Sequence, residues 1–356
     1  MTYDYSETVD YLLHWYDYNQ RILPWRENPK PYYVWVSEIM LQQTRVEAVK
    51  GYFERFLEGL PDIQALAEAP EEKLLKLWEG LGYYNRVRNL QKAAKIVMEQ
   101  YGGELPADYK ELLKLPGIGS YTAGAISSIA FQLPEPAVDG NLLRVCKRIS
   151  GSFDDITKEK VKKGLEEDLR AIMPKDRPGD YNQALMELGA TVCIPNGVPL
   201  CEKCPVMHLC TAFKKGLTDQ IPVKPSKKAR KIEERTILVL ECDNQYAIRK
   251  REEKGLLAGL WELPSLDGSY GIIKIQEYMK ELGINVIEVE QLPKAKHIFS
   301  HIEWHMLGYR IRLDEMNSVK EKLDDTIMFA SKQEIMDVYT LPTALVAYRN
   351  VIEAIK

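Results

Sequence analysis

The spacing of apolar residues divides the chain into two regions with different secondary structure. From Tyr5 to about Lys215, apolar side chains recur every three or four residues, for example over residues 72–78 and 90–101, which predicts amphipathic helices. Prolines followed by acidic residues or alanine mark several breaks, as is typical of the first turn of a helix. We therefore predict an all-α region over residues 1–221.

The last third of the chain alternates apolar and polar residues over short runs, which is typical of β-strands. We expect strands at residues 236–242, 246–251, 296–301, 304–312 and 327–330. Helical spacing returns near residues 275–282, so residues 236–356 are predicted to form a separate, smaller α+β domain. Residues 222–235 lie between the two regions and carry six basic against two acidic side chains. This composition indicates a solvated linker or a segment that contacts phosphates.

The composition narrows the class of protein. With 356 residues, of which 45% are hydrophobic and 28% charged, the chain has the composition of a soluble globular protein of two domains. It has neither an apolar run of about 18 residues nor a secretion signal, so we expect no membrane association and a cytoplasmic protein. The net charge of -4 requires any nucleic-acid-binding surface to be local.

Residues 112–126, LLKLPGIGSYTAGAI, contain the sharpest local motif. Two glycines, Gly117 and Gly119, permit a tight turn, and the N–H groups at the next helix start, near Ser120, can hold a phosphate. An ordinary glycine-rich turn between packed helices is the alternative. The sequence Leu-Pro-Gly-Ile-Gly between two predicted helices favours a helix-hairpin-helix, which positions a protein on a nucleic-acid backbone.

Four cysteines fall within 18 residues, in the spacing C-x7-C-x2-C-x5-C. They are Cys193, Cys201, Cys204 and Cys210. Four clustered thiols in a long chain without an export signal are more often metal ligands than disulfide partners. The set suits tetrahedral zinc or a [4Fe–4S] cluster, and the single C-x2-C pair favours the cluster over a zinc ribbon.

A third motif, Ala-Val-Asp-Gly-Asn at residues 137–141, places a carboxylate about 20 residues after the glycine turn. Without further context, Asp139 would be interpreted as a helix cap. Its place after the hairpin favours a functional role.

Together these three motifs resemble the helix-hairpin-helix DNA glycosylases of the endonuclease III superfamily, and within it the MutY-type adenine DNA glycosylases. Further motifs support the resemblance, namely LPWR at 23–26, YVWVSEIMLQQTRV at 33–46, LGYYNR at 81–86 and YNQALMELGA at 181–190. The resemblance covers nearly the whole chain. One departure is the segment between the first two cysteines, IPNGVPL, which has seven residues where the family usually has six.

The resemblance implies a monofunctional enzyme of base excision repair that hydrolyses the N-glycosidic bond of adenine opposite 8-oxoguanine or guanine. Glu38 matches the general acid, in an apolar setting that would raise its pKa. Asp139 matches the carboxylate that stabilises the sugar cation, oriented by Asn141. Tyr121 stands where lyase-competent relatives have a lysine, and a phenol cannot form a Schiff base.

The resemblance also implies two groups of substrate contacts. Arg21, Trp25 and Gln183 match residues of the adenine pocket. Gln43, Thr44 and Tyr83 match residues beside the oxidised guanine. The C-terminal domain resembles the Nudix-like module of these enzymes, in which the loop holding Phe299, Ser300 and His301 would probe 8-oxoguanine.

A hydrolytic Nudix site is not expected, because residues 276–284 contain only Glu277 and Glu281 as candidate magnesium ligands. The expected partner is double-stranded DNA with A:8-oxoguanine or A:G mispairs, bound by a monomer that carries a [4Fe–4S] cluster. Two alternatives remain, a bifunctional glycosylase/lyase similar to endonuclease III and a non-catalytic iron–sulfur DNA-binding protein.

Overall fold

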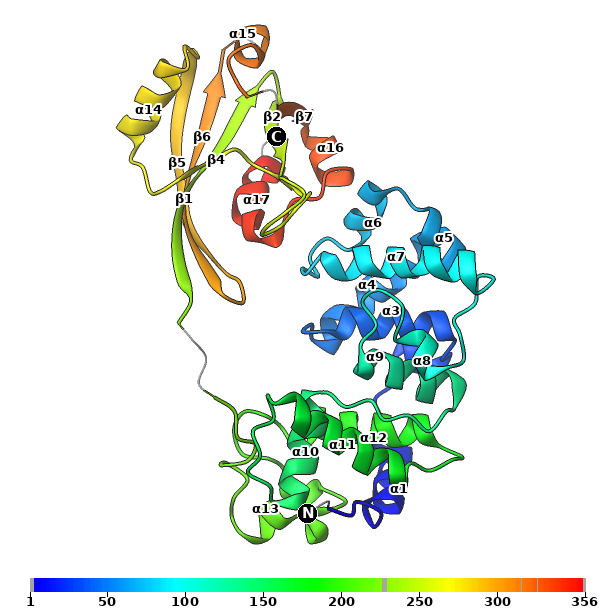
Figure 1. The fold of residues 1–356 in the computed structure, drawn as a ribbon. Helices are drawn as coiled ribbons and strands as arrows, with labels where there is room; N and C mark the ends of the chain where they lie inside the picture. The colour runs from blue at the N-terminus through cyan, green and yellow to red at the C-terminus, as the bar shows by residue number, and fades with distance from the viewer. Residues whose placement is uncertain (1–2, 226–228, 315, 325, 355–356) are drawn as a thin grey trace. The chain divides into compact units, whose positions relative to one another are not determined.

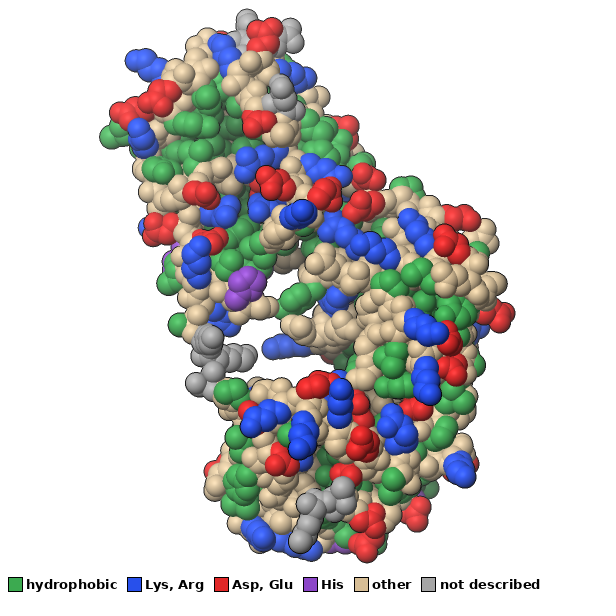
Figure 2. All heavy atoms as spheres, viewed as in Figure 1, with side chains coloured by type: hydrophobic (Ala, Val, Ile, Leu, Met, Phe, Trp, Pro, Cys, Tyr) green, Lys and Arg blue, Asp and Glu red, His purple; other side chains and the backbone are tan. Residues whose placement is uncertain are grey.

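A computed structural model describes residues 3–225, 229–314, 316–324 and 326–354 of the chain. Two compact units make up the protein. The first contains Met1–Glu68 and Arg86–Ser226, and the second contains Ala69–Asn85 and Lys227–Lys356. Within the described residues, no helix combines the length and apolar character that a membrane span requires. On the face drawn in Figure 2, basic and acidic side chains are interspersed over both units, in keeping with the small net charge.

The first unit is built from helices, as the apolar spacing predicts (Figure 1). The longer ones are α1 (Thr8–Asn19), α3 (Pro31–Leu41), α4 (Val46–Gly59), α7 (Asn85–Gln100), α10 (Gly140–Ser150), α11 (Glu159–Ile172) and α12 (Pro178–Thr191). The shorter ones are α2 (Pro24–Glu27), α5 (Ile63–Glu68), α8 (Tyr109–Leu112), α9 (Ser120–Ala125) and α13 (Thr211–Lys214). A π-helical turn, Ile126–Ala130, continues α9, and two 3-10 turns, Cys201–Lys203 and Met207–Leu209, lie in the cysteine segment.

One core of this unit lies where α1, α10 and α12 pack together. Leu12 and Tyr16 of α1, Val145 of α10, and Tyr181 and Leu188 of α12 are all buried there. Helix α10 directs its apolar face into this core and keeps its polar positions along one side. The packing therefore fixes the N-terminus of α10, where Asp139 lies.

The second unit contains a seven-stranded mixed sheet with helices on both faces. The strands are β1 (Lys231–Cys242), β2 (Gln245–Lys250), β3 (Trp261–Glu262), β4 (Ser265–Asp267), β5 (Val286–Ile298), β6 (Ile302–Leu313) and β7 (Ile327–Ser331). Their order is β3-β2-β1-β6-β5, with β4 paired to β1 and β7 paired to β2. Strands β1 and β6 run parallel, and the remaining pairs are antiparallel.

Alternating residues of β1 enter two cores. Ile237 and Val239 face α16 (Lys332–Asp337) and α17 (Val346–Ala354), whereas Leu238 and Leu240 face α14 (Ile272–Glu281). A strand covered on both faces is apolar at successive positions. This accounts for the run TILVLEC that marks the strand in the sequence. The short α15 (Met316–Lys320) follows β6.

The structure differs from the sequence-based expectation in several elements, and three of these differences have a clear physical reason. Strand β1 begins at Lys231, inside the expected linker, because residues 231–235 pair with β6 although most of their side chains are exposed. Strand β5 begins at Val286, ten residues before the expected start, as a largely exposed edge strand with two irregularities in register. The helix α6 (Glu71–Leu77) groups with the second unit, where Lys76 donates to the carbonyls of Ile335 and Tyr339.

Candidate active site

A pocket of about 180 Å³ lies in the first unit among α2, α3, α9, α12 and the N-terminus of α10. Eight residues that the sequence analysis singles out line it, from five separate segments of the chain. They are Arg21, Trp25, Glu38, Thr44, Tyr121, Asp139, Asn141 and Gln183. Gln43 is exposed beside Thr44, with a positive φ of 61°. The predicted catalytic and adenine-pocket residues are thus brought together in one cavity.

Glu38 is the buried carboxyl group of this pocket. Helix α3 starts with Pro31 at a first-turn position and buries seven consecutive residues from Val34 to Met40. The side chain of Glu38 is buried in the pocket, and the hydroxyl of Tyr121 donates to its Oε2 at 2.6 Å. Burial raises the pKa of Glu38 to about 7, the nearby charge of Asp139 adds to the rise, and the Tyr121 hydrogen bond opposes it. A carboxyl group with this pKa can donate a proton near neutral pH.

Asp139 is both a helix cap and a pocket residue. Its Oδ1 accepts the backbone N–H groups of Asn141 at 2.9 Å and Leu142 at 2.8 Å, at the start of α10. Its Oδ2 accepts the side-chain amide of Asn141 at 2.7 Å. Burial raises the pKa of Asp139, while these three hydrogen bonds act in the opposite direction. Donated hydrogen bonds and a helix N-terminus both favour the ionised form, so Asp139 is the better carboxylate of the two acids.

A chain of hydrogen bonds continues from Asp139 along α10. The side-chain oxygen of Asn141 accepts from Arg144 Nη2 at 3.1 Å. Arg144 also donates to the carbonyls of Gly189 and Cys193, each at 2.8 Å. The position of Asn141, predicted to orient the carboxylate, is therefore fixed by an arginine that also holds the start of the cysteine segment.

The four cysteines line a second cavity, among apolar side chains of α10 and α12. Arg148 donates to Cys193 Sγ at 3.3 Å, and burial raises the pKa of Cys204 to about 12. Within the described ranges, no three His, Cys, Asp or Glu side chains are arranged to hold a single metal ion. The four thiols line one apolar cavity beside an arginine, and thiolates of this kind are ligands of zinc and of iron–sulfur clusters. Cys146 and Cys242 are also buried but do not line this cavity.

Arg21, one of the adenine-pocket candidates, is held by two residues that the sequence analysis did not single out. Arg21 forms an ion pair with Glu187 of α12, and Arg26 Nη2 contacts the same carboxylate at 2.8 Å. Glu187 is fully buried, and Arg26 also lines the pocket. Both residues belong to motifs that carry the family resemblance, but a glutamate on an amphipathic helix gives no sign of burial in the sequence.

The hairpin turn has the geometry that its two glycines permit. Gly117 has a φ of 80°, and a Cβ there would lie 2.9 Å from the Cβ of Asn89. Gly119 precedes α9 and is exposed, with open space around its Cα. Ser120 Oγ accepts from Lys162 Nζ at 2.9 Å, so a cation lies beside the helix N-terminus. The turn thus presents backbone and a basic side chain to solvent.

The remaining predicted contacts lie in the second unit. Tyr83 is half-exposed with a φ of 49°, and its hydroxyl lies 3.0 Å from Ser300 Oγ. Phe299 packs edge-on against Trp304, with ring centres 4.9 Å apart, and His301 is exposed. The structure therefore brings Tyr83 into contact with Ser300 of the predicted probe loop.

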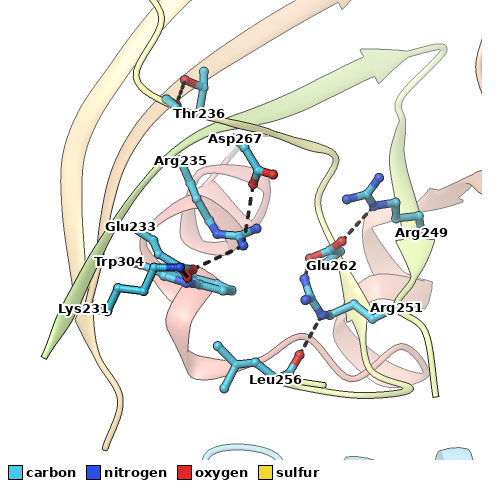
Figure 3. A network of polar contacts seen from close by, with 11 residues as sticks. Lys231, Glu233, Arg235, Thr236, Arg249, Arg251, Leu256, Glu262, Asp267 and Trp304 are labelled. Carbon is cyan, nitrogen blue, oxygen red and sulfur yellow. Dashed lines mark hydrogen bonds and ion pairs between the residues drawn. The ribbon is translucent and has the colours of Figure 1, made fainter. Parts of the chain in front are cut away.

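A network of polar contacts rich in arginine lies around Trp304 and Glu262 of this unit (Figure 3). Arg235 lies over the ring of Trp304 at 4.3 Å, and Glu233 accepts from the Trp304 indole at 3.1 Å. Arg249 and Arg251 both pair with the buried Glu262. Glu277 on α14 is exposed and lies 3.5 Å from Lys274. The carboxylate of Glu262 is thus committed to arginines.

Comparisons with known proteins identify the family of the chain and its two domains. The family model of the HhH-GPD superfamily of base excision DNA repair proteins matches residues 36–171, and that of the NUDIX domain matches residues 235–350. An adenine DNA glycosylase of Buchnera aphidicola is 35% identical over 85% of this chain and 86% of its own length. The chain belongs to the adenine DNA glycosylase family. The mouse member is 36% identical to this chain, over 85% of this chain and 70% of its own length. The human member is also 36% identical, over 86% of this chain and 67% of its own length.

Solved structures of DNA glycosylases have a fold similar to that of the first unit. A thermostable thymine-DNA glycosylase matches with a TM-score of 0.54 and 30% identity, over 59% of this chain and 96% of that chain. Endonuclease III in a trapped covalent complex with DNA matches with a TM-score of 0.50 and 28% identity, over 59% of this chain and 95% of that chain. The predicted fold class, a helix-hairpin-helix glycosylase region followed by a Nudix-like domain, is confirmed. The predicted enzyme class, a hydrolase of N-glycosyl bonds, is confirmed by membership of the family.

Proposed function

We propose that this member of the family is a monofunctional DNA glycosylase that removes adenine paired with 8-oxoguanine or guanine in duplex DNA, in base excision repair. The observation that carries the proposal is the pair of acids, Glu38 and Asp139, in one pocket with different surroundings. Cleavage of a glycosidic bond needs one protonated and one ionised carboxyl group. A protein that only binds DNA has no use for this arrangement.

The adenine must leave the stack to reach buried groups, at a cost of a few kcal/mol that is smallest at a mispair. The protonated carboxyl of Glu38 then donates its proton to the departing base, and the bond between the base and C1′ breaks. The carboxylate of Asp139 stabilises the positive charge that develops on the sugar. Water adds to C1′ and loses a proton, which returns the carboxylate of Glu38 to its protonated form and leaves free adenine and an abasic site.

Tyr121 supports a monofunctional reaction. Its phenol donates to Glu38 and has no amine with which to form an imine with the sugar. Borohydride trapping with an adenine:8-oxoguanine duplex is expected to give no covalent adduct, whereas a trapped adduct would identify a glycosylase/lyase.

Recognition of the oxidised guanine is proposed for Tyr83 and Ser300, with Gln43 and Thr44 beside the strand. The contact between Tyr83 and Ser300 supports a shared role for a stacking ring and a hydroxyl. The exposed hairpin turn at Gly117–Ser120 supports backbone contacts with duplex DNA.

The four cysteines are proposed to hold a [4Fe–4S] cluster, with Arg148 beside the ligand Cys193. Such a cluster, bound by four thiolates, would order the loop between α12 and α13. Iron and sulfide in a ratio of one to one, four of each per chain, would support the proposal. One zinc ion per chain without sulfide would support the alternative.

The decisive experiment measures strand scission by alkali on duplexes that pair adenine with 8-oxoguanine, guanine or thymine. Excision from the first two and none from the third supports the proposal. A non-catalytic binder would retain the duplexes in a gel without excision from any of them. We expect the protein to act as a monomer in the bacterial cytoplasm, associated with the nucleoid.

A further inference from the structure

A fully buried glutamate lies behind two arginines of the pocket. Glu187 of α12 has no exposed surface, and its Oε2 accepts from Arg21 Nη2 at 3.2 Å and from Arg26 Nη2 at 2.8 Å. Arg26 also donates to the backbone carbonyl of Arg21 at 3.1 Å. The two arginines line the pocket, and the carboxylate joins them from the protein side. One acid therefore fixes two cationic side chains of the pocket wall.

The burial of this carboxylate requires an explanation beyond packing. A buried carboxylate loses its hydration and is tolerated only where charged partners replace it. Glu187 gains these partners from two segments that are distant in sequence, the loop at Arg21 and the helix α2 that contains Arg26. Its charge thus serves the position and the electrostatics of residues in the pocket.

The charged groups around Glu38 include a guanidinium whose positive charge Glu187 compensates. Glu38 is faced by Tyr121 from α9, by Asp139 at the start of α10 and by Arg26 from α2. A positive charge near a carboxyl group favours its ionised form, so Arg26 opposes the protonated state that proton donation requires. Glu187 pairs with that same guanidinium.

Other charged or titratable groups complete the surroundings. Tyr16 of α1 lies under the guanidinium of Arg26, 5.7 Å from its ring centre, and Arg144 of α10 faces Asp139 through Asn141. Without Glu187, Arg21 and Arg26 would leave two unbalanced positive charges beside a sugar that itself becomes cationic. The uncompensated charge would favour the ionised form of Glu38 and would repel the positive charge that develops on the sugar.

We propose that Glu187 is a positioning residue for adenine excision: it holds Arg21 and Arg26 at the pocket wall and balances their charge, so that Glu38 keeps its proton. The inference rests on the proposed function and adds a residue outside the pocket to it. A residue that only stabilised the fold would change the amount of active enzyme and leave the pH dependence of the reaction unchanged.

The test measures single-turnover excision from an adenine:8-oxoguanine duplex between pH 5 and pH 9. The rate is expected to fall at alkaline pH as Glu38 loses its proton. In Glu187→Gln this alkaline limb should move to lower pH by about one unit, so that the rate at pH 8 falls by about tenfold more than the rate at pH 5.5. Asp180→Asn, on the same helix and ion-paired outside the pocket, is the matched control and should keep the limb in place.

Two further variants keep the test decisive if Glu187→Gln is not recovered folded. Arg26→Gln leaves the pair of Glu187 with Arg21 and should move the limb to higher pH, and Glu187→Asp, which keeps the charge, should leave it near the wild-type position. The double variant Arg26→Gln/Glu187→Gln should restore it. A limb that stays fixed in Glu187→Gln, or that moves to lower pH in Arg26→Gln, overturns the inference. Absence of excision by the wild type overturns the proposed function and this inference with it.

Discussion

Replacement of Glu38 by glutamine tests the central acid of the pocket in two independent ways. The amide keeps the size of the side chain and can still accept the hydrogen bond of Tyr121, but it cannot donate a proton to a leaving base. The substitution therefore removes the proposed chemistry and the titration of one buried group, with little change in packing. The first readout is the excision rate, and the second is the dependence of stability on pH.

The expected loss of rate follows from the surroundings of Glu38. A carboxyl with the ordinary pKa of 4.5 would be protonated in about one molecule in 300 at pH 7, whereas a pKa of about 7 leaves about half of the molecules protonated. A positioned general acid contributes about 10²–10⁴-fold to a rate. Single-turnover excision by Glu38→Gln should therefore fall by at least about 100-fold, while binding of the duplex in a gel is retained.

The same pKa makes a prediction about stability. Because the folded state holds the Glu38 proton more tightly than the unfolded state, the stabilisation is fully present below about pH 4.5 and is lost as the pH rises through about 7. The loss amounts to about 3 kcal/mol, from 1.36 kcal/mol for each pH unit between the two values. Glu38→Gln has no such group, so its free energy of unfolding relative to wild type should increase by up to this amount between pH 5 and pH 8.

Denaturant unfolding of both proteins at pH 5, 6, 7 and 8 measures this difference. The exposed Glu47 of α4, replaced by glutamine, provides a control with the same change of charge, and its difference from wild type should stay constant over this range. An excision rate within tenfold of wild type would refute the assignment of Glu38 as the acid. A stability difference that does not change with pH would refute the account of its burial.

Three further predictions concern the residues around the two acids. Tyr121→Phe removes a hydrogen bond that lowers the Glu38 pKa, so the alkaline limb of the excision profile should move to higher pH; a shift to lower pH would contradict this. Asn182→Ala removes the hydrogen-bond partner of three buried polar groups and should lower the free energy of unfolding by about 2–4 kcal/mol in denaturant unfolding. A decrease of less than about 1 kcal/mol would contradict this account. Gly117 has a positive φ that alanine adopts poorly, so Gly117→Ala should weaken duplex binding several-fold. Gly164 lies in a helix with open space around it, so Gly164→Ala should not weaken duplex binding.

The parts of the site that local sequence describes could be predicted, and the parts that depend on distant partners could not. Glu38, Tyr121 and Asp139 stand in short motifs, and the structure brings them into one pocket. Glu187 and Asn182 also stand in a motif, YNQALMELGA, but both are fully buried polar residues on an otherwise apolar helix face. Their roles depend on arginines and backbone groups more than 40 residues away in sequence.

The same distinction applies to the fold. Helices and the two-faced strand β1 follow from the apolar pattern, because burial sets that pattern. The edge strand β5 is held by pairing with β6 and exposes most of its side chains, so its sequence lacks the alternation that marks a strand. The association of α6 with the second unit depends on ion pairs and backbone contacts, such as Glu79 with Arg349, that no local pattern contains.

Helix α10 explains why the pocket and the cysteine cavity are parts of one structure. Asp139 caps its N-terminus, and Arg148, about two turns further along, contacts Cys193 and the carbonyl of Ile194. Arg144, between them, holds Asn141 on one side and the carbonyl of Cys193 on the other. Because the helix is buried along most of its length, a displacement of the cysteine segment would be transmitted to its polar side and so to the donors that keep Asp139 ionised. Arg144 and Arg148 therefore link the cysteine segment to the helix whose N-terminus is capped by Asp139.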